Sequence, residues 1–95
     1  MNENKRKIAW SKQFKKDLKE ARKQNRDIDL LFDIVYQLAN DIKLDPKHKD
    51  HKLKGKLKDY RECHLLGDWL LVYEKPDAKR LVLLELGSHS RLKLK

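Results

Sequence analysis

The hydrophobic pattern of this chain changes its period part-way along, and this change sets the fold class. From Phe14 to Ala21, and again from Leu31 to Ile42, apolar residues recur at the three- and four-residue spacing of a helix. After Tyr60 they gather instead in short runs rich in leucine, valine and aromatic residues, separated by turn residues. The chain is therefore predicted to be an α+β protein.

Local signals predict the order of the elements. A short strand over residues 7–10 precedes Ser11, which can cap the first helix. Asp27 or Asp29 can cap a second helix, which must stop before Pro46 because proline disfavours helical geometry in the residue before it. We expect both helices to pack on one face of an antiparallel meander. Its three predicted strands span residues 60–65, 69–74 and 80–86.

Basic residues concentrate in the segment between the second helix and the meander. The chain carries 24 Lys and Arg against 15 Asp and Glu, a net charge of +9. Residues 43–61 hold eight of these cations and three acids, and residues 43–58 are predicted to form a long ordered loop. Such a charge attracts polyanions at long range. The pattern favours a nucleic-acid partner over a merely solubilising surface.

Several classes of protein are excluded. The longest apolar run, residues 69–73, is far shorter than the roughly 18 residues needed to span a bilayer. No apolar signal-peptide segment follows the charged start. Cys63 is the only cysteine and cannot form an internal disulfide, which indicates a reducing compartment. We therefore expect a cytoplasmic protein without membrane contact.

All four histidines lie after residue 47, in or near the basic loop and the meander: His48, His51, His64 and His89. Histidine suits proton transfer near neutral pH. Cleavage of RNA by its own 2′-hydroxyl needs a base for that proton, an acid for the leaving 5′-oxygen and cations for the phosphorane. Composition alone leaves open that His64 and His89 are ordinary half-exposed residues of the sheet.

A metal site and a thiolate site have weaker support. His48 and His51 have H-x-x-H spacing around Asp50, but no third ligand stands at a recognisable spacing, and the nearby lysines oppose a divalent ion. Cys63 and His64 are neighbours on a predicted strand, so they point to opposite faces and cannot form a catalytic pair. We expect no metal, no cofactor and a buried cysteine.

Four motifs follow one another along the chain, and together they resemble the YafQ-like branch of the RelE superfamily, bacterial toxins of type II toxin–antitoxin systems. They are Lys49-Asp50-His51-Lys52-Leu53-Lys54-Gly55, Tyr60-Arg61-Glu62-Cys63-His64, Asp68-Trp69-Leu70-Leu71-Val72-Tyr73 and Leu86-Gly87-Ser88-His89. The resemblance implies one RelE-like toxin domain over residues 1–95. It also implies a ribosome-dependent endoribonuclease that cleaves mRNA in the A site by metal-independent acid–base catalysis, without a cofactor.

The resemblance also implies the roles of individual residues. The catalytic set is His51, His64, Asp68 and His89, with His89 as general acid, and His64 with Asp68 as the base or its orienting partner. Trp69 is expected at the RNA-facing edge. The family often carries an arginine two positions before the last glycine or next to it, where this chain has Glu85 and Leu86.

Cations elsewhere are expected to contact RNA. Arg61 is the first candidate to supply the positive charge of the missing arginine, and Arg91 is the second. In the basic loop, Lys52, Lys54 and Lys56 are expected to position RNA phosphates.

The implied partners are the mRNA and an acidic cognate antitoxin whose C-terminal segment wraps the basic surface. No DNA contact is expected except through that antitoxin. Two alternatives stay open. One is a gyrase-poisoning toxin on the same fold, which would not need a histidine cluster, and the other is a non-catalytic RNA-binding module.

Overall fold

A mixed sheet with two helices on one face forms the framework of this protein, seen in a computed structural model that describes residues 4–57 and 59–92. In that part of the chain the sheet has five strands in the order β1-β5-β4-β3-β2. β1 runs parallel to β5 and the other neighbours are antiparallel. The elements are β1 (Lys7–Trp10), α1 (Lys12–Lys23), α2 (Ile28–Ala39), β2 (His51–Lys52), β3 (Arg61–Leu66), β4 (Trp69–Glu74), β5 (Arg80–Ser88) and α3 (His89–Leu92). The predicted α+β class and its order of strand, two helices and meander are confirmed.

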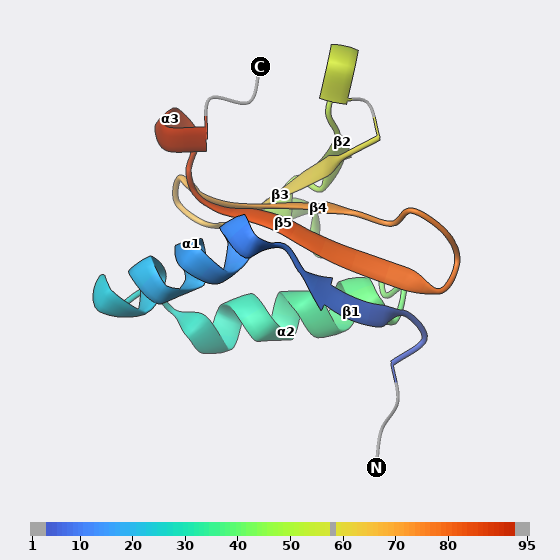
Figure 1. The fold of residues 1–95 in the computed structure, drawn as a ribbon, viewed down its shortest axis with the longest axis horizontal. Coiled ribbons are helices and arrows are strands. Elements are labelled where there is room, and N and C mark those ends of the chain that lie inside the picture. The colour runs from blue at the N-terminus through green and yellow to red at the C-terminus, as the bar shows by residue number, and fades with distance from the viewer. Residues whose placement is uncertain (1–3, 58, 93–95) are drawn as a thin grey trace.

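Both long helices begin at side-chain caps and cover the same face of the sheet (Figure 1). Ser11 Oγ accepts the backbone N–H of Phe14 at 2.9 Å, and Asp27 Oδ1 accepts that of Leu30 at 3.0 Å, as a helix N-cap requires. The main core lies between these helices and the sheet. Its fully buried members include Phe14, Leu31, Ile34, Leu71, Tyr73, Leu81 and Leu83.

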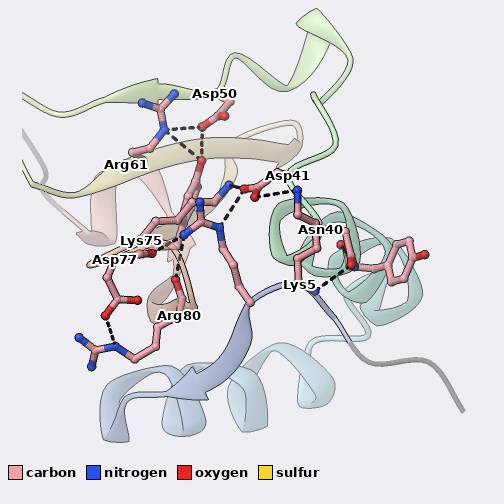
Figure 2. Close-up of polar contacts among 11 residues, drawn as sticks. Lys5, Asn40, Asp41, Asp50, Arg61, Lys75, Asp77 and Arg80 are labelled. Atoms are coloured by element: carbon pink, nitrogen blue, oxygen red, sulfur yellow. Dashed lines mark hydrogen bonds and ion pairs between the residues drawn. The ribbon is translucent and has the colours of Figure 1, made fainter.

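The second helix ends earlier than its apolar stripe suggests. α2 stops at Ala39, and Asp41 follows in the left-handed region with φ of 56°, a conformation that ends helices. The Asp41 carboxylate accepts bonds from Lys75 Nζ and Arg6 Nε, each at 2.8 Å (Figure 2). This polar anchor fixes the corner, and Ile42 is left 45% exposed.

The predicted basic loop contains more structure than expected. It holds two 3-10 turns, η1 (Pro46–His48) and η2 (Gly55–Leu57), and between them the two-residue strand β2, which pairs with β3. Lys58 lies outside the described residues. The loop is therefore attached to the edge of the sheet, and its short strand carries one of the candidate histidines.

Candidate active site

The face of the sheet opposite α1 and α2, here called the open face, carries Glu62, His64, Leu70, Val72 and Gly87. No long helix lies on it, but a second apolar cluster buries its middle, where Leu92 packs on Leu70 and Val72. Glu62 and His64 are two residues apart on β3, so both side chains lie on this face. His64 pairs with Leu70, and Leu70 pairs with Gly87, which forms one row across three strands. The adjoining row runs through Glu62, Val72 and Glu85, and β2 extends it by His51.

Asp68 and His89 meet at one end of the open face. Asp68 lies in the turn between β3 and β4, and His89 follows the last residue of β5. The backbone N–H of His89 donates to the carbonyl oxygen of Asp68 at 3.1 Å, and both side chains are exposed. His64 stands two residues before Leu66, which pairs with Trp69 across this turn. The structure thus brings His64, Asp68 and His89 to one end, with His51 in the adjoining row.

His51 is held between two oxygen acceptors. Its Nδ1 lies 2.6 Å from the carbonyl oxygen of Lys49, and its Nε2 lies 3.2 Å from Glu62 Oε1. Glu62 is 4% exposed, and among the described residues its Oε2 has no hydrogen-bond partner. The histidine is therefore paired with a buried carboxylate.

His48 supports His64 from the edge of the sheet. Its side chain is buried, and its Nδ1 lies 2.6 Å from the carbonyl oxygen of His64, where the pairing of β3 with β4 shifts register. His51 instead faces the open side of the sheet, so the two rings of the H-x-x-H pattern diverge. Among residues 4–57 and 59–92, no group of three or more His, Cys, Asp or Glu side chains is placed to hold a metal ion.

The cysteine is buried, as predicted. Cys63 is fully buried on the helix side of β3, and burial raises the pKa of its thiol well above the usual range. Because the thiolate is the reactive form, this residue has a packing role and no nucleophilic one.

Trp69 does not lie at an RNA-facing edge, in contrast to the expectation from the sequence. It is 2% exposed and belongs to the main core with Leu71 and Tyr73, which lie two and four residues further along β4. The guanidinium of Arg26 lies over its ring, 5.5 Å from the centroid. The indole is therefore unavailable to stack on a base.

Arg61 is likewise separated from the histidines. It pairs with Tyr73 across β3 and β4 and so faces the helix side, opposite to His64. Its Nε lies 3.1 Å from the Tyr73 hydroxyl and 3.3 Å from Asp50 Oδ1. The side chain of Arg91 lies outside what the structure describes. The three loop lysines, Lys52, Lys54 and Lys56, are exposed.

Three residues that shape the site were not assigned to it from the sequence: Glu62, Asp17 and His48, the last of which was named only among the histidines and as a weak metal candidate. Asp17 is buried, and its Oδ2 accepts the backbone N–H of Leu86 at 2.9 Å, which ties α1 to β5 shortly before His89. A signal was present in two cases. Glu62 and His64 are two residues apart on one predicted strand, so their side chains should lie on the same face. Asp17 stands on the apolar stripe of the first helix.

Comparison with known proteins identifies the family. A family model described as "Bacterial toxin of type II toxin-antitoxin system, YafQ" matches residues 6–94. The chain belongs to the YafQ toxin family. The predictions of a YafQ-like toxin, and of an endoribonuclease as its enzyme class, are thereby confirmed.

Relatives of known name and structure agree along almost the whole chain. The mRNA interferase toxin YafQ of Escherichia coli K12 is 38% identical over 88 residues, covering 92% of this chain and 95% of the relative. The solved E. coli DinJ-YafQ toxin-antitoxin complex matches with a TM-score of 0.84 and 37% identity, covering 93% of this chain and 97% of that one. The solved structure of a metal-bound toxin from Helicobacter pylori matches with a TM-score of 0.83 and 53% identity, covering 90% of this chain and 96% of that one.

Among the described residues, no helix is both long and apolar enough to cross a bilayer.

Proposed function

We propose that this YafQ-family toxin is a ribosome-dependent mRNA interferase that cleaves mRNA in the A site without a metal ion. The 2′-hydroxyl of the message attacks the adjacent phosphate, and the 5′-oxygen leaves. The observation that supports this most is the placement of His64, Asp68 and His89 at one end of the open face by strand pairing and by the His89–Asp68 backbone bond, with His51 in the adjoining row. Such a group offers both a base and an acid for the two proton transfers.

In this proposal each side chain has a distinct task. His89 is the general acid for the leaving oxygen, and His64 and Asp68 together provide and orient the base. His51, paired with Glu62, completes the group on the same face. The exposed Lys52, Lys54 and Lys56 contact phosphates of the message. Trp69 has no contact with RNA because it is buried in the main core, whereas the Arg61 guanidinium, which is 33% exposed, is held by Tyr73 and Asp50.

The proposed partner that silences the toxin is an acidic cognate antitoxin. The solved E. coli DinJ-YafQ complex supports this assignment. A net charge of +9 favours an acidic segment that folds on the toxin surface, and DNA is then contacted only through the antitoxin.

Induction of the chain without an antitoxin tests this function against its rivals. We expect growth arrest with new mRNA 5′ ends in primer extension and unchanged plasmid supercoiling. Intact messages with altered supercoiling would instead identify a gyrase-poisoning toxin. Ribosome binding with intact messages would identify a non-catalytic RNA-binding module.

A further inference from the structure

The strand that carries His51 is too short to hold this side chain by itself. β2 has two residues, both exposed, at the edge of the sheet, and long polar segments flank it. Short edge strands with few ladder bonds are among the least stable parts of a sheet. A side chain in an active site must nevertheless be held close to its productive geometry. Some other contact must therefore fix this strand.

A polar cluster of Asp50, Arg61 and Tyr73 lies on the other side of the same strand. The Tyr73 hydroxyl donates to Asp50 Oδ1 at 2.5 Å, and Arg61 Nε contacts both partners, at 3.3 and 3.1 Å. Figure 2 shows Asp50 and Arg61 directed toward each other from the loop and from β3. Tyr73 is 1% exposed on β4, inside the main core. The cluster thus connects the loop to a central strand of the sheet.

The charge state of the cluster suits this task. Burial, together with the neighbouring Asp50 carboxylate, raises the pKa of Tyr73 well above its usual value. The phenol therefore keeps its proton and remains a donor at neutral pH. Burial alone would lower the pKa of Arg61, but its contacts with Tyr73 and Asp50 raise it, so the guanidinium stays charged.

We propose that Tyr73 and Asp50 are positioning residues for His51, an inference that rests on the proposed function. Asp50 immediately precedes His51, and Arg61 immediately precedes Glu62. One ion pair therefore fixes the helix side of this edge while the His51–Glu62 pair occupies the open face. Neither Tyr73 nor Asp50 touches the substrate. Their effect on cleavage passes through His51.

A double-mutant cycle tests this dependence. Single-turnover cleavage of ribosome-bound mRNA is measured for wild type, Tyr73→Phe, His51→Gln and the double variant, with Tyr36→Phe as matched control because Tyr36 is exposed on α2. We expect Tyr73→Phe to lower the rate about 10- to 100-fold in the wild-type background and not at all in the His51→Gln background. Equal losses in both backgrounds, or no loss in the first, would overturn the inference.

A second readout separates this inference from the proposed function. Nuclear Overhauser contacts between the His51 ring and Glu62 are expected in wild type and Tyr36→Phe and should disappear in Tyr73→Phe. If the wild type fails to cleave, the proposed function is wrong, while contacts retained in Tyr73→Phe would independently contradict the positioning role. Full cleavage by His51→Gln would remove His51 from the mechanism and overturn the inference with it.

A milder variant is used if Tyr73→Phe does not fold at the assay temperature. Asp50→Ala removes the shared acceptor of the cluster and leaves the buried Tyr73 phenol in place, and the Asp50 side chain is already 25% exposed, so less folding stability is at risk. The same pattern of rates and contacts is expected, and the same outcomes would contradict it.

Discussion

The backbone N–H of His89 donates a hydrogen bond to the carbonyl oxygen of Asp68, 3.1 Å away, and joins the exit of β5 to the turn between β3 and β4. Neither side chain takes part in this bond. Substitution of either side chain therefore leaves intact the contact that brings the two residues together. Variants at these positions report on chemistry more than on folding.

His89→Gln should lower single-turnover cleavage by about 10²- to 10⁴-fold, the usual contribution of a positioned acid or base. Ribosome binding should stay nearly unchanged, because the variant keeps the backbone contact and the charge of the loop. Rates on preformed ribosome complexes, beside cosedimentation with ribosomes, measure the two effects separately. Full activity in this variant would remove the acid from the mechanism.

Cleavage should not depend on a divalent ion at the protein. The rings of His48 and His51 diverge, with His48 bound to the His64 carbonyl and His51 paired with Glu62. In a purified ribosome system, cleavage is expected to survive excess EDTA when magnesium is returned only to the level that keeps ribosomes intact. Loss of cleavage that zinc or copper alone restores would contradict this expectation.

The loop lysines should control the salt dependence of binding. Replacing Lys52, Lys54 and Lys56 together by Gln is expected to weaken ribosome binding. The slope of the logarithm of the binding constant against the logarithm of salt concentration should become shallower by about 0.7 to 0.9 for each lost phosphate contact. Lys7→Gln with Lys79→Gln is the control, because β1 and the start of β5 lie near the sheet edge opposite to β2. The same slope change per lysine in both variants would show a general charge effect only.

Acid should weaken the corner built on Asp41. Hydrogen bonds from Lys75 and then Arg6 hold the pKa of Asp41 below its ordinary value of 3.8. A carboxyl whose pKa is lower in the folded state stabilises the protein fully above the ordinary value and loses this contribution as pH falls below it. Asp41→Asn should therefore lower the unfolding midpoint at pH 7, and its difference from wild type should shrink below about pH 4. A difference that is constant with pH would refute this role.

Much of the fold was predictable from periodicity and caps. The apolar spacing and Ser11 and Asp27 define the two helices, and the turn residues divide the meander. The two-residue β2 was not predictable, because so short a strand has no period of its own. Its pairing with β3 is a long-range contact that depends on the fold.

The candidate site was predictable in residue type but less so in orientation. The motifs pointed to the histidines, whereas the family resemblance implied an RNA-facing Trp69. Alternate residues of a strand face the same side, so Trp69 points with Leu71 and Tyr73 toward the helices. Glu62 lies on the same face as His64, two residues away. Its contact with His51 could not be predicted, because it depends on the pairing of β2 with β3.

Attack by the 2′-hydroxyl is the central chemical claim, and one substrate tests it most directly. Ribosome-bound mRNA with a single 2′-deoxyribose immediately 5′ of the scissile phosphate is compared with the all-ribose message under single-turnover conditions. We expect the all-ribose message to be cut, with a 2′,3′-cyclic phosphate and a 5′-hydroxyl as first products, and the deoxy message to stay intact at that site. Cleavage of both messages at the same rate would contradict attack by the 2′-hydroxyl and the catalytic roles assigned to the open face.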